Sequence, residues 1–474
     1  MSSAAPRSTL VAIVVAGLVG AVWLNQGVSH ARASAAMDAM EDPLHHPLDG
    51  VRFGLLELYE RSGDEEINFA VAKATRGLPY DEARLLQRGH DTPAFFDRAP
   101  SADGHWHRPY VEVPFEYPIA MLPFVLMPSF GGGGASFEMY TRVFGVMTTL
   151  MLLGATWLAL RKSSSQAVRV ESLGSGRESW WMLALLLLAQ GSLAIQRLDA
   201  VPALLLAATL WAATSRKPAL TGLALGLATA TKLFPVLLVP LVVAADLEAW
   251  RERRVALRGA LAFAAAVLVG FAPMLFPPDA LIDVLRYHAA RGLHVESTGG
   301  ALLALGRLLL GSARGATLSY GSYNLDGSAP DVVAMLATPL MLLLLLGAAV
   351  WLARAPQEDN ETARRDRIAL ALLAGLAVLW LSAKTFSPQY LTWAIPLVLA
   401  VSGSRGKKLR WLLFFILTVT QVYMRGFYGQ LIAGTPVGVG FVLLRLPLLV
   451  LFLLVALRSE GREPRDGLVL NPSG

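Results

Sequence analysis

The chain has 474 residues, of which 54% are hydrophobic and only 16% are charged. A soluble globular domain carries about 45–50% apolar and about 25% charged residues, so this composition excludes an ordinary soluble protein. The net charge of +6 does not indicate nucleic-acid binding, because the basic residues stand in short clusters between apolar runs, as they do in membrane proteins. Since there is no cysteine, disulfides, thiolate metal sites and cysteine nucleophiles are excluded.

Apolar runs long enough to form a bilayer-spanning helix of about 20 residues recur along the chain. Six clusters of Lys and Arg separate these runs, and such clusters mark cytoplasmic loops. The clusters lie within residues 161–177, 216–217, 251–258, 364–367, 405–410 and 458–465. Placing all six in the cytoplasm requires an even number of crossings between them, which predicts twelve helices with both chain ends in the cytoplasm. The predicted spans are 9–27, 138–160, 178–196, 199–215, 219–232, 235–248, 257–276, 331–353, 368–385, 389–403, 411–425 and 436–457.

The requirement for an even number of crossings between clusters helps to interpret three segments. The run at 9–27 is similar to a signal peptide, but its length and the many spans that follow favour a first membrane helix. Residues 221–247 are predicted to form a hairpin of two short helices, broken near Lys232 and Pro235, because proline lacks an amide hydrogen and disfavours helix in the preceding residue. Residues 117–127 are too few to cross, so we expect an interfacial or re-entrant helix.

The unusual polar residues fall on the non-cytoplasmic side. A first external loop is predicted at 28–116 and a second external segment at 277–330, within a single membrane domain that spans residues 1–474. All eight histidines map to these two segments, whereas the cytoplasmic clusters are typical of plain topology signals. We therefore expect any chemistry to face the outside.

Carboxylates of the first external loop are one group of candidates. Asp64, Glu65 and Glu66 precede an amphipathic stretch. Acidic residues in a first helical turn often cap the helix and interact favourably with its dipole, so a structural role would explain them. The alternative is a catalytic carboxylate. Tyr117, at the start of the short apolar run, is typical of the membrane interface and is by itself a weak signal.

Charged residues at the outer ends of the spans are the second group. Arg197 and Asp199 stand beside apolar helices, where charges usually pair with each other or face a cavity. Lys232, at the hairpin break, either extends its ammonium group to the interface or binds an anionic group. Two further polar clusters lie on the same side of the membrane. They consist of Arg291, His294 and Glu296, and of Lys384, Gln389, Tyr390 and Trp393.

Four stretches give the chain a family resemblance. They are Arg197-Leu-Asp199-Ala-Val-Pro202, Gly222-Leu-Ala-Leu-Gly226 with Lys232-Leu-Phe-Pro235, Arg291-Gly-Leu-His-Val-Glu-Ser297, and Phe386-Ser-Pro-Gln-Tyr390 with Trp393. In this order, and on one side of the membrane, they resemble glycosyltransferase family 87, membrane mannosyltransferases of the GT-C superfamily that use polyprenyl-phosphate sugars. The resemblance implies an all-α GT-C bundle with juxtamembrane helices in a large first external loop. It also implies an active site at the outer membrane interface.

The same resemblance implies an inverting transfer of a sugar, with mannose favoured, from a polyprenyl-phosphate donor to a glycolipid or glycan acceptor. Aligned on Gly77 and Tyr80, the family's catalytic aspartate corresponds to Asp64. Asn68 stands where the family often has an aromatic residue, so Glu66 is kept as the alternative. Cations that bind the donor phosphate are expected at Lys232, Arg291, His294 and Lys384. Sugar or acceptor ligands are expected at Tyr117, Arg197, Asp199, Glu296, Gln389, Tyr390 and Trp393.

The expected partners are the lipid-linked donor, the glycolipid or glycan acceptor and the lipid bilayer, with no nucleic acid. No cofactor is expected, and a divalent metal is the alternative. Histidine pairs such as His45-His46 lack the spacing of a helical metal motif. The frequent use of Ala, Leu, Arg and Gly favours a bacterial inner membrane, with the site on its periplasmic side. A multi-pass solute transporter, or a GT-C transferase for another sugar such as arabinose, are the alternative functions.

Overall fold

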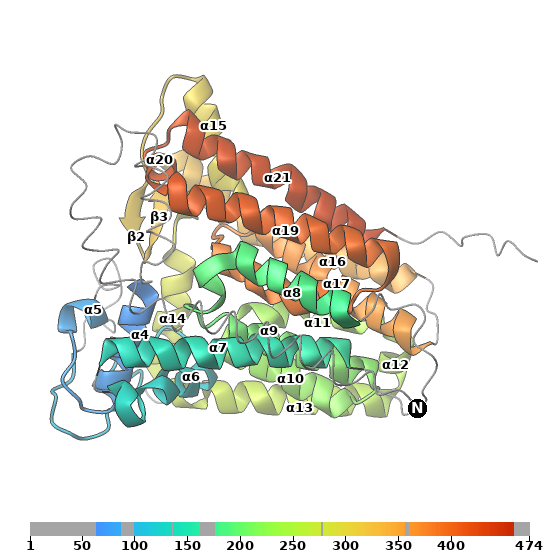
Figure 1. The fold of residues 1–474 in the computed structure, drawn as a ribbon, viewed down its shortest axis with the longest axis horizontal. Helices are drawn as coiled ribbons and strands as arrows, with labels where there is room; N and C mark the ends of the chain where they lie inside the picture. Colours follow the sequence, from blue (N-terminus) through green and yellow to red (C-terminus); the bar gives the residue numbers. More distant parts are fainter. Residues whose placement is uncertain are drawn as a thin grey trace, which may run out of the picture.

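The computed structural model describes residues 63–86, 99–134, 136–161, 176–275, 278–355 and 360–458. This part of the chain is mostly helical, and its long helices run along the long axis of the molecule (Figure 1). The predicted first span, 9–27, lies outside the described residues, as do residues 28–62 and 87–98 of the predicted first external loop.

Helices occupy each of the eleven other segments predicted to span the membrane. In chain order these are α7 (Phe137–Leu160), α8 (Gly176–Gln190) with η5 (Gly191–Ala194), α9 (Ala200–Thr214), α10 (Pro218–Thr231), η6 (Phe234–Leu238) with α11 (Val239–Ala245) and α12 (Leu247–Arg251), α13 (Arg253–Phe271) with η7 (Ala272–Leu275), α16 (Ser328–Arg354), α17 (Glu361–Ser382), η8 (Pro388–Ala394) with α18 (Ile395–Ala400), α19 (Gly403–Gly426) and α21 (Pro436–Leu457). Within the described ranges, four helices are long and apolar enough to cross a membrane. They are Phe137–Leu160, Arg253–Leu275, Ser328–Arg354 and Pro436–Leu457. The number of twelve crossings therefore stays a prediction.

The predicted break in the hairpin is confirmed. α10 ends at Thr231, and Lys232 takes an extended backbone with φ −154° and ψ 128°. The helix η6 begins two residues later, with Pro235 in its first turn. Because proline fits the first turn of a helix better than its interior, it marks the start of the second half of the hairpin.

The short apolar run at 117–127 is helical, but it is divided into separate pieces. They are η2 (Ile119–Met121), α6 (Leu122–Leu126) and η3 (Met127–Ser129), followed by η4 (Gly131–Gly134). Pro123 and Pro128 each stand in the first turn of a piece, which explains the divisions.

One end of the bundle carries the segments that were predicted to lie outside the membrane (Figure 1). The helices there are α4 (Gly63–Thr75), α5 (Glu82–Leu86), α14 (Pro278–Ala290), α15 (Thr298–Leu309) and α20 (Tyr428–Ile432). We call this the external end.

The all-α prediction is wrong within the segment 277–330, where a small antiparallel sheet forms. Its strands, in the spatial order β1-β3-β2, are β1 (Leu293–His294), β3 (Ser322–Leu325) and β2 (Thr317–Ser319). Tyr320 and Gly321 have positive φ angles of 50° and 67°, the geometry of a two-residue hairpin turn. Strands of two to four residues are too short to show an alternating pattern in the sequence, so they were missed.

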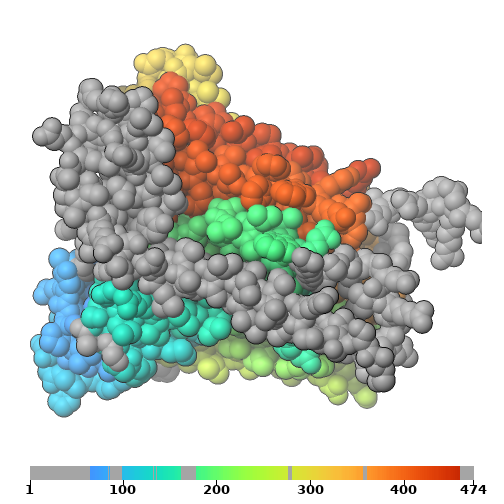
Figure 2. Space-filling model, in the orientation of Figure 1, coloured from blue at the N-terminus to red at the C-terminus, as the bar shows by residue number. Residues whose placement is uncertain are grey.

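The flanks of the bundle are apolar. Leu268 and Val269 on α13, and Met335 and Leu343 on α16, are exposed although they are large hydrophobic residues. Exposed apolar surface of this extent is typical of membrane contact. On the face shown in Figure 2, α19 and α21 (orange to red) lie above α8 (green), and the described part of residues 63–134 (blue to cyan) lies at the lower left.

The basic cluster at residues 364–367, at the other end of the bundle, takes part in the packing of the helices. α17 begins several residues before the predicted position 368, and its arginines are part of the fold. Arg364 donates a hydrogen bond to the carbonyl oxygen of Thr214 at the end of α9 (3.5 Å), and Arg367 donates to that of Ala245 at the end of α11. These donors satisfy carbonyl groups that have no partner within their own helix. The interpretation of this cluster as a plain topology signal was therefore incomplete.

Glycine allows α10 and α13 to approach each other closely. A Cβ atom on Gly222 would lie 2.0 Å from the carbonyl oxygen of Gly259. Small residues that permit such contact are common where membrane helices pack. We expect Gly222→Ala to lower the free energy of unfolding by about 1–3 kcal/mol through overpacking, measured by denaturant or thermal unfolding in detergent.

Gly145 of α7 provides a matched control for this variant. A Cβ atom there would meet nothing within 4 Å, and alanine is a better helix former than glycine. We therefore expect Gly145→Ala to leave the protein equally or slightly more stable. If the two alanine variants unfold at the same temperature, the close contact between α10 and α13 is contradicted.

Candidate active site

A cavity of about 840 Å³ lies at the external end of the bundle. Its walls come from parts of the chain that are distant in sequence, including the start of the short apolar run, η6, α14, the sheet and the segment before η8. Nine predicted site residues are among the described residues that line it. They are Tyr117, Arg197, Lys232, Arg291, His294, Glu296, Gln389, Tyr390 and Trp393. The fold therefore gathers most of the predicted site around one space.

Lys232 and Asp199 form an ion pair at the wall of this cavity. The Lys232 Nζ atom lies 2.8 Å from Asp199 Oδ1, and Trp393 Nε1 donates a hydrogen bond of 2.6 Å to the same oxygen. Asp199 directly precedes α9 and Lys232 directly follows α10, so the pair joins two adjacent helix ends. Because the Asp199 side chain is buried, the hydrogen bonds to it compensate for its loss of contact with water.

A stack of three aromatic rings holds the indole of Trp393. The Phe234 ring lies 3.7 Å from it at an interplanar angle of 8°, and the Tyr390 ring lies 4.6 Å from it at 18°. Two rings that stack this closely cannot share one face of an indole without overlapping, so they cover its two faces. Trp393 therefore has no open ring face for a sugar, and its expected role as a sugar or acceptor ligand would have to use its edge. Tyr390, which lines the cavity and is only partly buried, is the better placed ring.

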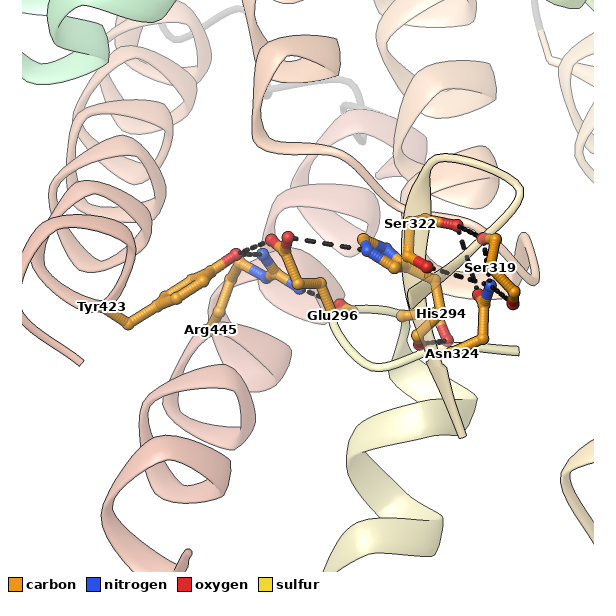
Figure 3. A network of polar contacts seen from close by, with 8 residues as sticks. His294, Glu296, Ser319, Ser322, Asn324, Tyr423 and Arg445 are labelled. Atoms are coloured by element: carbon orange, nitrogen blue, oxygen red, sulfur yellow. Dashed lines mark hydrogen bonds and ion pairs between the residues drawn. The ribbon is translucent and has the colours of Figure 1, made fainter. Parts of the chain in front are cut away.

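Glu296 lies within a second buried network, shown in Figure 3. Its carboxylate accepts a hydrogen bond from Tyr423 Oη, and Arg445 donates to the same Tyr423 oxygen at 2.7 Å and to the backbone oxygen of Glu296. The Arg445 guanidinium also lies 3.9 Å from the centre of the Phe386 ring. Glu296 follows β1, Tyr423 belongs to α19 and Arg445 to α21, so the network ties the external segment to the last two long helices.

Burial changes the protonation of three groups in the external segment. It raises the pKa of Glu296 to about 7, although the hydrogen bond from Tyr423 acts in the opposite direction. It lowers the pKa of His288 to about 4, and, together with the charge of Arg291, it lowers the pKa of His294 to about 3. Both imidazoles are therefore neutral near pH 7. In this state His294 can contact a phosphate as a hydrogen-bond donor, and its predicted role at the donor phosphate stays a prediction.

Lys384 is not among the described residues that line the cavity. Its ammonium group donates hydrogen bonds of 2.7 Å to the backbone oxygens of Ala289 and Arg291. These contacts use two of its three donors and hold the backbone where α14 ends. They argue against the predicted phosphate role and favour a structural one.

For Asp64, the predicted catalytic carboxylate, the structure describes the position of the backbone alone. Asp64 is the second residue of α4, and its side chain lies outside those that the structure describes. Glu66, the alternative, is partly buried and is not among the described lining residues. α4 lies at the external end (Figure 1). The choice between Asp64 and Glu66 stays a prediction.

Several lining residues were not predicted as ligands. Glu116 stands directly before Tyr117, and His288 stands close to Arg291, so both lie next to residues that sequence reasoning had selected. Tyr428 follows the end of α19 and carries no motif that would have revealed it. Among the residues that the structure describes, no group of three His, Asp or Glu side chains is arranged to hold a metal ion. The expectation that the protein needs no metal stays a prediction.

Comparison with known families adds a finding that is independent of this geometry. The family model of glycosyltransferase family 87 matches residues 115–382, which is more than half of the chain. The chain belongs to glycosyltransferase family 87. The family 87 match includes Arg197, Lys232 and the external segment, but it ends before the segment with Lys384 and begins after Asp64. A search of curated proteins finds no match.

Proposed function

We propose that this family 87 glycosyltransferase moves a sugar, with mannose favoured, from a polyprenyl-phosphate donor to a glycolipid or glycan acceptor. The transfer takes place at the non-cytoplasmic face of a bacterial inner membrane. Family membership makes the chain a membrane glycosyltransferase. The lipid-linked donor is supported by the composition of the cavity wall.

One flank of the cavity is apolar and accessible. Val236 of η6, Leu285 of α14 and Leu342 of α16 line it, and they are 43%, 48% and 48% exposed. A hydrocarbon chain suits such a flank, because apolar groups there are kept from water. Lys232 and Arg291 line the same cavity and suit an anionic head group. A donor with a long apolar tail and a phosphate matches both the apolar flank and the cationic residues of the cavity. This match is the observation on which the proposal rests.

The proposed reaction is an inverting displacement. The acceptor hydroxyl oxygen attacks the anomeric carbon while the bond from that carbon to the phosphate oxygen breaks, and the electron pair leaves on polyprenyl phosphate. The hydroxyl proton passes to a carboxylate, for which Asp64 is the candidate implied by the family resemblance. Lys232 and Arg291 stabilise the charge that develops on the leaving phosphate. Because the phosphate already activates the donor sugar, no nucleotide is required.

Product release in a defined bilayer tests this proposal. The purified protein is placed in lipid nanodiscs with a short-chain polyprenyl-phosphate mannose, and release of polyprenyl phosphate is followed with a membrane extract as the source of acceptor. We expect release that depends on the extract. If folded protein releases nothing from this or any other polyprenyl-phosphate sugar, the proposal is overturned and a transport function is favoured.

Lys232→Met is expected to weaken use of the donor more than use of the acceptor. The loss of a charged hydrogen-bond donor to the phosphate corresponds to an increase of about 10- to 100-fold in the donor KM. Initial rates measured against each substrate separately will show this difference. A larger effect on the acceptor KM would contradict the phosphate role of Lys232.

Lys384→Met provides the comparison for this variant. It removes an equal charge at the same end of the bundle, but that charge is bound to backbone oxygens. We expect it to lower the thermal stability of the protein while the folded enzyme keeps its donor KM.

A further inference from the structure

Asp199 was expected to bind the sugar or the acceptor, but its surroundings give it another role. Its side chain is 2% exposed, and Asp199 is not among the described residues that line the cavity, whereas Lys232 and Trp393 are. Two side-chain contacts fall on the same atom, Oδ1, at 2.8 Å from Lys232 Nζ and 2.6 Å from Trp393 Nε1. As seen from the cavity, the Asp199 carboxylate therefore lies behind the Lys232 side chain.

The position of Asp199 in the chain makes this arrangement unusual. It is the N-cap residue of α9, where an aspartate normally accepts a hydrogen bond from the first helical turn. Its side chain makes no such hydrogen bond. The carboxylate is turned toward Lys232 and Trp393 instead, so the helix start gives up a common stabilising contact in favour of the ion pair.

The ammonium group of Lys232 is confined on several sides. It lies 4.8 Å from the centre of the Tyr390 ring, 5.3 Å from that of Trp393 and 5.9 Å from that of Tyr117. Aromatic faces attract a cation at these distances. A lysine side chain otherwise loses considerable rotamer freedom when it binds a ligand. Here that freedom is already restricted before any ligand enters.

We infer that Asp199 and Trp393 are positioning residues that hold the Lys232 ammonium group at the cavity wall, ready for an anionic ligand. Asp199 supplies the countercharge and the direction of the hydrogen bond, and Trp393 holds the carboxylate through its indole N–H. The ring stack with Phe234 and Tyr390 in turn holds the indole. The inference rests on the proposed function only in naming the ligand as the phosphate of the lipid-linked donor.

Chemical labelling tests the positioning without any substrate. The rate at which Lys232 reacts with an amine-directed acylating reagent is measured by mass spectrometry on folded protein in nanodiscs, with Lys384 as the internal reference. We expect Asp199→Asn to increase the rate at Lys232 several-fold. The asparagine amide cannot form the ion pair that holds this group as the unreactive ammonium ion. Trp393→Phe keeps a ring in the stack but loses the N–H group, so it should give a smaller increase in the same direction.

Thr392→Val is the matched structural control. Thr392 neighbours Trp393 and accepts a hydrogen bond from Gln190 at 2.9 Å, but no described contact joins it to Asp199. It is expected to lower stability without changing the labelling of Lys232. Equal labelling rates in Asp199→Asn and in the unmodified protein would overturn the inference, whatever the enzyme is found to transfer.

A double variant separates positioning from direct sugar binding. We expect Asp199→Asn to raise the donor KM by about tenfold, as the loss of a charge-assisted contact would, with the acceptor KM unchanged. Since Asp199 acts through Lys232, adding Asp199→Asn to Lys232→Met should cause little further loss. Fully additive losses, or a selective effect on the acceptor KM, would show that Asp199 contacts substrate directly and would overturn the inference.

Discussion

Asp64→Asn is expected to reduce the turnover number by about 10²- to 10⁴-fold, the usual contribution of a general base. The asparagine amide has nearly the same shape as the carboxylate but cannot accept the acceptor proton. The loss should therefore fall on kcat, with both substrates still bound. The rate of polyprenyl-phosphate release in nanodiscs measures it, and donor binding by the inactive variant shows that the fold is intact.

Neighbouring carboxylates decide whether Asp64 is the right residue. Glu66→Gln changes the alternative in the same helix, and Glu116→Gln changes a carboxylate that lines the cavity. Near-normal turnover in Asp64→Asn, combined with an inactive Glu66→Gln, would assign the base to Glu66. If only Glu116→Gln is inactive, neither residue of α4 is the base and the family alignment of this segment fails.

Arg445→Met is expected to lower the free energy of unfolding by about 3–5 kcal/mol, because it breaks a buried charge network from one side. Tyr423 and the Glu296 backbone oxygen lose their donor, and the Glu296 carboxylate loses a nearby positive charge. Unfolding in detergent, followed by circular dichroism, measures the loss. The double variant Arg445→Met with Glu296→Gln should recover part of it, since no uncompensated carboxylate is then buried.

The same network predicts how this loss depends on pH. The pKa of Glu296 in the folded protein, about 7, lies above the ordinary carboxyl value of 4.5. Its protonated form therefore favours folding, and that contribution is full below the unfolded pKa and is lost as the pH rises through about 7. Without Arg445 the ionised form is still less favourable, so the destabilisation should be larger above pH 7 than well below it. A loss that does not vary with pH would contradict the link between Arg445 and Glu296.

Features that depend on local sequence were predictable. The break after Thr231 follows from Pro235, because proline restricts the backbone of its own and the preceding residue. Lys232 could be identified as a candidate site residue because it is a lysine at such a break, surrounded by apolar residues. The external segment could be selected because Arg291 stands in a cluster of polar residues between spans.

Contacts between distant segments were not predictable. Trp393 and Asp199 are 194 positions apart, and no periodicity in either segment indicates that one holds the other. The contact of Tyr423 with Glu296 likewise joins segments that are far apart in the sequence. Lys384 shows the same limit, since residue type alone did not indicate that this cation donates hydrogen bonds to backbone oxygens. Residue type and side of the membrane locate a site, but only packing decides which side chains face the cavity.

α9 and α10, which are both predicted to cross the membrane, are short helices. They contain 15 and 14 residues, which at 1.5 Å per residue is about 21–23 Å. The hydrocarbon layer of an ordinary bilayer is about 30 Å thick. Their inner ends lie at the end of the bundle opposite the cavity, where Arg364 binds the last carbonyl of α9. If the inner boundary of the hydrocarbon layer is set at those ends, the outer ends of both helices fall short of its outer boundary. Lys232 and Asp199 then lie about 7–9 Å below that outer boundary. For the proposed lipid-linked donor, this depth means that the phosphate would have to descend below the lipid head groups to reach Lys232.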